Sequence, residues 1–253
     1  MDAETDINSL VICTPTHLPE LTTLEIRRIR IALKYNPGIP HVFVLPENIS
    51  SSFYRNYFPS SLIVNFPEQN FADFHAYNQF MLKKTIYEYF RTFRYMLIMQ
   101  SDAFLTRNIK PLLNLNYSYI GAPWIPGYKI QTVGKRLFFN KSIPFVKIIE
   151  IEIGNGGLSL RKISDMLMIV DWWQGNVNKI NLYRGGRLVM NEDLAISYAA
   201  NKLSLPIPSL EDSKNFFLEK FPSTESSLDV FGFHGLNKYN PELELELIKQ
   251  HER

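Results

Sequence analysis

The sequence predicts an α/β fold in which a mostly parallel central sheet is flanked by helices and the C-terminal half is less regular. Up to residue 99, short apolar runs alternate with longer stretches that carry a helical pattern. The short runs are apolar throughout, which is typical of parallel strands covered by helices on both faces. The chain has 253 residues, 45% of them hydrophobic, which is enough for the core of one large domain.

The first half of the chain contains four predicted strands and two predicted helices. The run SLVICT predicts the first strand, and residues 19–35 predict a helix that begins after its proline. The runs HVFVL and SLIVNF predict two further strands, which end at Pro46 and Pro67. A long helical stretch covers residues 73–93, where Asp73 is a candidate N-cap, and YMLIM predicts the fourth strand.

A basic segment interrupts the second half. After a short predicted strand in YSYIGAPW, residues 127–149 contain no acidic residue and no clear period. We expect a solvated loop there. The alternative is a patch that faces an anionic acceptor, such as a lipid diphosphate at a membrane surface. The basic residues of the segment are Lys129, Lys135, Arg136, Lys141 and Lys147.

The remaining elements follow the run IEIGNGGLSLR. Residues 162–173 and 191–203 predict two helices, the second with Asn191 as its N-cap. A late strand and turn are expected within residues 226–238. The chain closes on a helix that begins at Pro241, although leucine and glutamate alternate there with the period of a strand. No repeat, low-complexity tract or clear linker is present, so residues 1–253 are predicted to form a single domain.

Composition excludes several classes of function. The net charge is only +2, which gives no global electrostatic reason to bind nucleic acid. Cys13 is the single cysteine, so an intramolecular disulfide and a two-cysteine metal site are excluded, and we expect a buried strand residue. The N-terminus MDAETD is acidic, unlike a secretory signal, and no apolar run is long enough to cross a bilayer. A cytoplasmic, reducing setting is the expectation.

Polar residues follow two predicted strands. Asp102 comes just after YMLIM, and Thr14 and Thr16 lie in the turn CTPTH after the first strand. Ligands of open parallel sheets bind beyond the carboxyl ends of the strands, so these residues are candidates for one crevice. A turn-capping role for Asp102 is an equal alternative, and a simple turn is the favoured interpretation of the two threonines.

Three further motifs contain candidate site residues. The glycines of GNGG, residues 154–157, permit close approach of a ligand, but a tight turn explains them equally well. In NED, Glu192 and Asp193 open a helix, where acids are favoured in any case, and at most one of them is expected to face a cleft as a general base. In GFHG, His234 lies between glycines; it is either a polar turn residue or a partner of Asp102 in a divalent-cation site.

In order, these motifs resemble a family assigned as glycosyltransferases and formerly labelled a domain of unknown function, with the GT-A type of nucleotide-sugar-binding fold. The resemblance covers about two thirds of the chain. It rests on YN (Tyr77, Asn78), QSDAF (100–104), YIGAPW (119–124), GNGGLSLR (154–161), ED (192–193) and GFH (232–234).

The resemblance implies a donor site at the end of the fourth strand. GT-A enzymes usually carry Asp-x-Asp there, and Gln100 replaces the first aspartate in this chain. It implies that Asp102 and His234 bind a divalent cation, Mn²⁺ or Mg²⁺, held more weakly than in a two-carboxylate site. The residues expected to contact the donor are Thr14, Thr16, Gln100, Ser101 and Asp102.

The resemblance also implies an acceptor site. Asp193 is the expected base that takes the proton of the acceptor hydroxyl in an inverting reaction, with Glu192 as the alternative; retaining chemistry would not need this base. Trp124 is a platform for the sugar or, equally, a core residue. Asn155, Gly156 and Gly157 complete the pocket for the sugar and the acceptor.

The implied protein is a hexosyltransferase of polysaccharide biosynthesis, with residues 1–108 binding the nucleotide and residues 109–253 binding the acceptor. The implied partners are a nucleotide sugar, UDP-linked by preference, and a hydroxyl of a glycan or lipid-linked acceptor, with peripheral contact at the inner face of the membrane. Two alternatives remain open. A non-catalytic carbohydrate- or nucleotide-binding module would account for Gln100. A nucleotidyltransferase would need a glycine-rich phosphate loop with Arg or Lys, which the first strand lacks.

Overall fold

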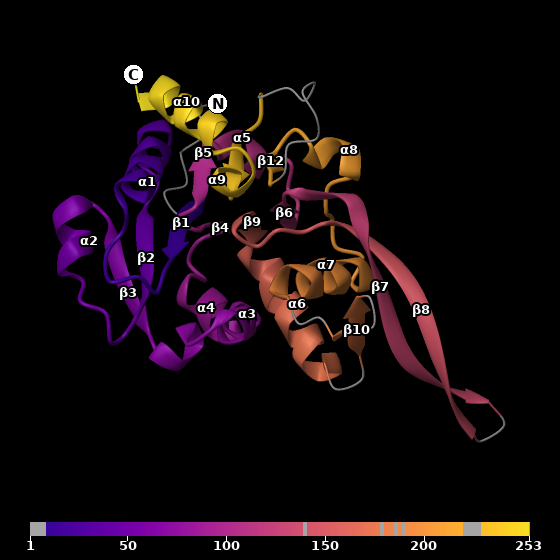
Figure 1. The fold of residues 1–253 in the computed structure, drawn as a ribbon. Coiled ribbons are helices and arrows are strands. Elements are labelled where there is room, and N and C mark those ends of the chain that lie inside the picture. The colour runs from indigo at the N-terminus through magenta and orange to yellow at the C-terminus, as the bar shows by residue number, and fades with distance from the viewer. Residues whose placement is uncertain are drawn as a thin grey trace, which may run out of the picture.

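The computed structural model of the protein describes residues 9–138, 141–177, 180–184, 187–188, 191–219 and 229–252. Its centre is a six-stranded sheet in the order β3-β2-β1-β4-β9-β6 (Figure 1). These strands are β1 Leu10–Pro15, β2 His41–Pro46, β3 Leu62–Phe66, β4 Tyr95–Met99, β6 Tyr119–Gly121 and β9 Leu158–Lys162. β1 to β4 pair in parallel, whereas β9 is antiparallel to both β4 and β6. The predicted α/β fold with a mostly parallel sheet is confirmed.

Helices cover both faces of this sheet. They are α1 Thr23–Tyr35, α2 Ser52–Tyr57, η1 Glu68–Phe71, α3 Phe74–Met81, α4 Lys84–Tyr89, α5 Lys110–Leu113, α6 Ile163–Asn176, α7 Glu192–Lys202, α8 Leu210–Ser213, α9 Leu236–Tyr239 and α10 Pro241–Glu252. None of the helices in the described ranges is both long enough and apolar enough to span a bilayer.

The apolar strands place successive side chains in two different cores. Val11 and Cys13 of β1 pack with α3, α4, α6 and α7, whereas Leu10 and Ile12 pack with residues of α1, α2 and α5. Because neighbouring side chains of a strand point to opposite faces, a strand buried on both faces must be apolar at every position. The predicted burial of Cys13 is confirmed, and burial raises the pKa of its thiol.

Local side-chain bonds decide where the helices of the first half begin and end. α1 begins at Thr23 rather than directly after Pro19, because Thr22 and Glu25 form a reciprocal capping box. Asp73 caps α3 as predicted, accepting from the backbone N–H of Ala76. The single helix predicted for residues 73–93 is wrong, because Lys83 adopts an extended backbone and separates α3 from α4. From this position its ammonium donates to Oδ1 of Asn70.

The loop predicted for residues 127–149 is wrong, because residues 127–138 and 141–149 lie in two paired strands. β7 Pro123–Phe138 and β8 Lys141–Ile153 pair antiparallel from Tyr128 and Ile151 to Phe138 and Lys141. β10 Asn181–Arg184 and β11 Arg187–Leu188 complete a four-stranded sheet with them. Figure 1 shows the β7–β8 hairpin extending away from the body of the protein.

A third sheet joins late residues to the end of β4. It contains β5 Ala103–Leu105, β12 Phe217–Leu218 and β13 Gly232–His234, in the order β12-β13-β5. β13 is the late strand that the sequence predicts, although residues 226–228 of that prediction lie outside the described part of the chain. The final helix predicted from Pro241 is confirmed as α10. α10 lies beside α1 (Figure 1), and its Glu244 forms a buried ion pair with Arg28 of α1.

Candidate functional site

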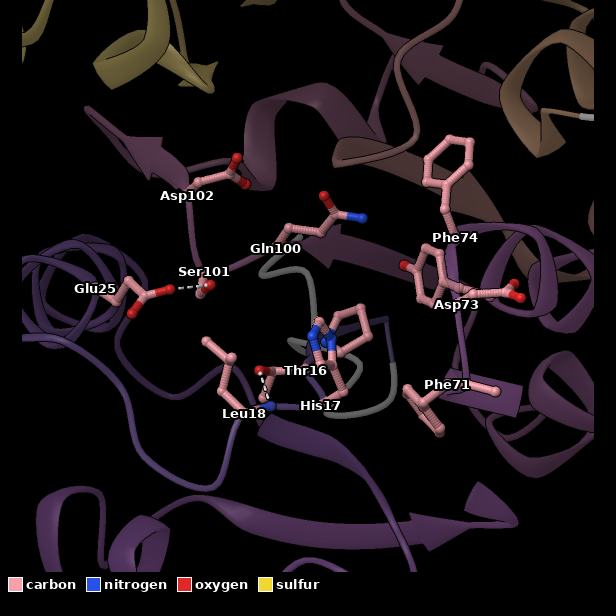
Figure 2. Close-up of a pocket in the computed structure, with 13 residues that line it drawn as sticks. Thr16, His17, Leu18, Glu25, Phe71, Asp73, Phe74, Gln100, Ser101 and Asp102 are labelled. Carbon is pink, nitrogen blue, oxygen red and sulfur yellow. Dashed lines mark hydrogen bonds between the residues drawn. The ribbon is translucent and has the colours of Figure 1, made fainter. Parts of the chain in front are cut away.

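A cavity lies beyond the carboxyl ends of β1 and β4. These strands are parallel neighbours, so the residues that follow them meet at the same edge of the sheet. The cavity has a volume of about 460 Å³ and is bordered by Thr16, Gln100, Ser101 and Asp102, four of the five predicted donor-site residues (Figure 2). The N-terminal part of α3 and the residue before it close the opposite side, where Phe74 is exposed.

The pairing of β13 with β5 brings His234 to Asp102. His234 lies opposite Ala103 in this ladder, and its Nε2 is 3.2 Å from Oδ1 of Asp102. The same Nε2 is 3.2 Å from Oε1 of Gln100. The other carboxylate oxygen of Asp102, Oδ2, accepts a hydrogen bond of 2.8 Å from the ammonium of Lys238. Burial opposes ionisation of Asp102, but His234 and Lys238 together hold its pKa well below the usual value.

A second cluster contains the two predicted carboxylates. Glu192 is buried, and its Oε1 is 3.2 Å from Nη2 of the fully buried Arg161. The backbone N–H of Glu192 donates to Oδ1 of Asn78 at 2.7 Å, so α7 starts against α3. Asn191 occupies the N-cap position as predicted, but its side chain makes no capping hydrogen bond.

Asp193 has a different environment from Glu192. Its side chain is half-buried, and Oδ2 accepts from the backbone N–H of Gly156 at 3.4 Å. Burial, and then the negative charge of Glu192, raise the pKa of Asp193 to about 7. A carboxyl group with such a pKa exchanges a proton readily near neutral pH, whereas the ion pair with Arg161 engages Glu192.

The two clusters meet at Gly156 and Gly157. A Cβ atom on Gly156 would lie 1.8 Å from Oε1 of Glu192, and one on Gly157 would lie 2.0 Å from Nε2 of His234. A side chain at either position would therefore have to displace the carboxylate of Glu192 or the imidazole of His234. Gly157 is also joined to the end of β4, because its carbonyl accepts from the N–H of Gln100 at 2.8 Å. We call Gln100, Asp102, His234 and Lys238 the Asp102 cluster. Two adjacent backbone units therefore separate the carboxylates of α7 from the Asp102 cluster.

The structure places three predicted site residues in supporting positions. Thr14 is fully buried, and its hydroxyl bonds to His41 rather than bordering the cavity. Asn155 adopts a left-handed backbone with φ of 59°, and its Oδ1 accepts from the N–H of Gly157. Trp124 is buried against Gly154, on which a Cβ atom would lie 1.8 Å from the indole ring.

The residues near Asp102 fit a divalent cation poorly. A site for Mn²⁺ or Mg²⁺ needs carboxylate oxygens that are free to coordinate, and both oxygens of Asp102 are engaged by His234 and Lys238. Gln100 adds an amide oxygen but no charge. Across the described ranges, no group of three or more His, Cys, Asp or Glu residues is placed to hold a metal ion. The divalent cation at this site stays a prediction.

Some residues of the candidate site lie in recognisable motifs, but their individual roles are not predicted from the sequence. Arg161 ends the motif GNGGLSLR and Asn78 ends YN, but their bonds to Glu192 depend on the packing of α7. Tyr77 borders the cavity, and its buried hydroxyl makes no hydrogen bond in the structure. Lys238 follows His234 by four residues, but His234 ends β13 and only Lys238 lies on α9, so this spacing alone does not place the ammonium at Asp102.

Comparison with known proteins places the chain in a family and supports the fold. The fold is similar to that of an active-site mutant of LgtC, with 11% identity, a TM-score of 0.50, and coverage of 96% of this chain and 95% of that chain. The galactosyltransferase LgtC in complex with donor and acceptor sugar analogs gives the same identity and coverage with a TM-score of 0.49. A glycosyltransferase involved in the glycosylation of the major capsid of PBCV-1 is 13% identical. That match covers 96% of this chain and 98% of that chain, with a TM-score of 0.45.

At these identities the likeness shows the fold alone, which is the α/β fold of GT-A glycosyltransferases. A comparison with curated protein sequences finds no match. A family model described as a protein of unknown function, DUF5672, matches residues 60–234. This range includes α3, β4, β9 and the N-terminus of α7, and it ends at His234. Because the match covers well over half of the chain, the protein belongs to the DUF5672 family.

Proposed function

We propose that this protein is a glycosyltransferase that moves a sugar from a nucleotide sugar to a hydroxyl group of a glycan or lipid-linked acceptor. One observation carries the proposal. A cavity at the carboxyl ends of β1 and β4 contains an Asp102 cluster suited to phosphate, and the Gly156–Gly157 backbone joins that cluster to a carboxyl group of raised pKa. Phosphate binding and proton removal are the two tasks that sugar transfer requires.

The nucleotide belongs in the cavity beside Thr16. A volume of about 460 Å³ is within the range of small-ligand sites. The aromatic residues Phe71, Phe74 and Tyr77 border this cavity, and their rings offer apolar surface to a nucleobase or ribose. The diphosphate then points toward Gln100 and Asp102, and the sugar toward Gly156.

The acceptor is activated by Asp193. The ionised carboxylate takes the proton of the acceptor hydroxyl, whose oxygen forms a bond to the anomeric carbon. The bond between that carbon and the diphosphate oxygen breaks, and its electron pair leaves with the nucleoside diphosphate. A single displacement of this kind inverts the anomeric centre. Glu192 does not compete as the base, because Arg161 binds its carboxylate.

The β7–β8 hairpin is proposed to face the acceptor. Lys129 lies on its described part and is exposed, and the sequence adds four more basic residues within residues 127–149. Such a strand pair attracts an anionic acceptor such as a lipid diphosphate at a membrane surface. Co-sedimentation with vesicles rich in phosphatidylglycerol tests this proposal. Charge reversal of the basic residues is expected to weaken co-sedimentation, and unchanged co-sedimentation contradicts the proposal.

Nucleoside diphosphate release and donor binding test the proposed function. The protein is incubated with UDP- and GDP-sugars, with and without Mn²⁺ or Mg²⁺, and binding is followed by isothermal titration calorimetry. We expect binding of at least one donor and slow hydrolysis in the absence of an acceptor. Absence of both, for every donor, contradicts the proposal. Binding without release or transfer to any acceptor supports the non-catalytic module instead.

The base is tested by Asp193→Asn. This variant removes the carboxylate while keeping its shape, so donor binding should be retained and transfer lost. Asp171→Asn is the matched control, because Asp171 lies on the surface of α6 in an exposed ion pair with Lys84. Intact transfer by Asp193→Asn would exclude Asp193 as the base and favour retaining chemistry.

A further inference from the structure

The backbone around Asp102 fixes the position of Lys238. His234 ends β13, and Gly235 follows with a left-handed backbone, φ of 62°, that starts the short helix α9. The N–H of Gly235 donates to the carbonyl of Asp102 at 3.1 Å, and the N–H of Lys238 donates to the carbonyl of Gly235 at 3.0 Å. Two short backbone bonds thus hold the start of the Lys238 side chain next to Asp102.

The ammonium of Lys238 remains accessible in this position. The Lys238 side chain is 58% exposed, whereas that of Asp102 is 22% exposed. An ion pair at the surface contributes little to stability, typically about 0–1 kcal/mol, so protein stability gives little reason for this arrangement. An ammonium has three donors, and Asp102 accepts one of them. Among the described residues Asp102 is the acceptor of this ammonium, so two N–H groups are left for a ligand beside Asp102.

The charges near the donor site also distinguish an ammonium from a metal ion. In the described part of the chain, three carboxylates border the cavity. Glu25 accepts from the hydroxyl of Ser101 and Asp73 accepts from the N–H of Ala76, whereas Asp102 stands next to the neutral Gln100 and is balanced by Lys238 at 2.8 Å. A divalent cation would have to displace this ammonium to reach Oδ2 of Asp102. A diphosphate arriving from the cavity needs no such exchange, because Lys238 already presents a positive charge and hydrogen-bond donors.

We infer that Lys238 supplies the positive charge that binds the diphosphate of the donor and stabilises it as it leaves, in the place of a divalent cation. The inference rests on the proposed function and deepens it, since it names a nucleoside diphosphate as the ligand of Lys238. Asp102 then acts as a positioning residue, because it borders the cavity and its Oδ2 accepts from the ammonium of Lys238.

Calorimetry with UDP and GDP tests the inference. Wild-type protein is titrated in excess EDTA and in excess MgCl₂, and the affinities should agree within about threefold. Lys238→Met should weaken UDP or GDP binding about 10- to 100-fold, as expected for loss of a charge-assisted hydrogen bond, and Lys238→Arg should restore most of it. The matching nucleoside lacks phosphates and should bind wild type and Lys238→Met equally.

Lys214→Met is the matched control, because Lys214 pairs with an exposed glutamate on the remote helix α8. The inference is overturned if EDTA abolishes nucleotide binding, or if Lys238→Met binds UDP and GDP as tightly as wild type. Failure of the proposed function gives a different result, because wild type then binds neither UDP nor GDP under any condition.

Discussion

The buried pair of Arg161 and Glu192 should be one of the most sensitive points of the site. The guanidinium of Arg161 is 0% exposed, and among the described residues it makes four hydrogen bonds. They reach Oγ of Ser159 at 2.9 Å, the hydroxyl of Tyr87 at 2.9 Å, the carbonyl of Gly156 at 3.3 Å and Oε1 of Glu192 at 3.2 Å. Arg161→Met removes all four contacts and keeps most of the apolar stem.

The expected loss follows from what remains behind. Removing one partner of a buried ion pair costs about 3–5 kcal/mol, because the other partner keeps an uncompensated charge. We expect the lower end of this range, about 3–4 kcal/mol. The free energy of unfolding of a folded domain is about 5–15 kcal/mol, and the variant should therefore still fold. If the free energy of unfolding falls by about 3 kcal/mol per M of urea, the urea concentration at the unfolding midpoint falls by roughly 1–1.5 M.

Equilibrium unfolding in urea, followed by circular dichroism, measures this loss. The double variant Arg161→Met/Glu192→Gln leaves no charge unpaired and should lose at least about 1 kcal/mol less than the sum of the two single losses. Arg27→Met is the control, because its partner Glu252 lies at the surface. The reasoning is refuted if Arg161→Met costs no more than Arg27→Met, or if the losses of the double variant are additive.

Three further outcomes are expected. Gly157→Ala should weaken UDP binding roughly tenfold or more, because its methyl group displaces the imidazole of His234; unchanged affinity in calorimetry contradicts that contact. The transfer rate should rise with pH and level off above about 7, because Asp193 accepts a proton only when ionised; a flat profile between about pH 5 and 8 contradicts its role as base. Thr16→Val should weaken UDP binding, whereas Thr14→Val should cost about 1 kcal/mol in urea unfolding and leave binding unchanged; the reverse result contradicts the position of the cavity.

Strands β1, β2 and β4 of the central sheet could be predicted because their runs are short, almost entirely apolar and buried along their length. The β7–β8 hairpin could not, because its order comes from cross-strand pairing rather than from a period within one segment. Gly134 and Pro144 lie within the paired region, and both residue types are unfavourable inside strands. β8 is an edge strand, where a proline is tolerated because its missing N–H leaves no partner unpaired.

Some residues of the candidate site could likewise be predicted from the sequence, and others could not. Asp102 could be predicted because a polar residue after a buried parallel strand has a defined place in the fold. The place of Lys238 could not, because it reaches Asp102 through the β13–β5 ladder, across 136 residues of sequence. Arg161 belongs to a motif of the sequence, but the packing of α7 against α6, β8 and α3 gives it Glu192 as a partner.

The glycine pair at the centre of the site has a consequence for how the activity can diverge. The backbone of residues 156 and 157 lies between Asp193, the proposed base on α7, and the proposed phosphate site at Asp102, and a Cβ atom at either position would displace Glu192 or His234. A substitution at Gly156 or Gly157 cannot change the spacing between these two sites in small steps, because even a methyl group there would contact Glu192 or His234. New sugar or acceptor preferences are therefore expected to arise at the cavity border, where Phe74 is exposed and free to vary, while the two glycines stay fixed.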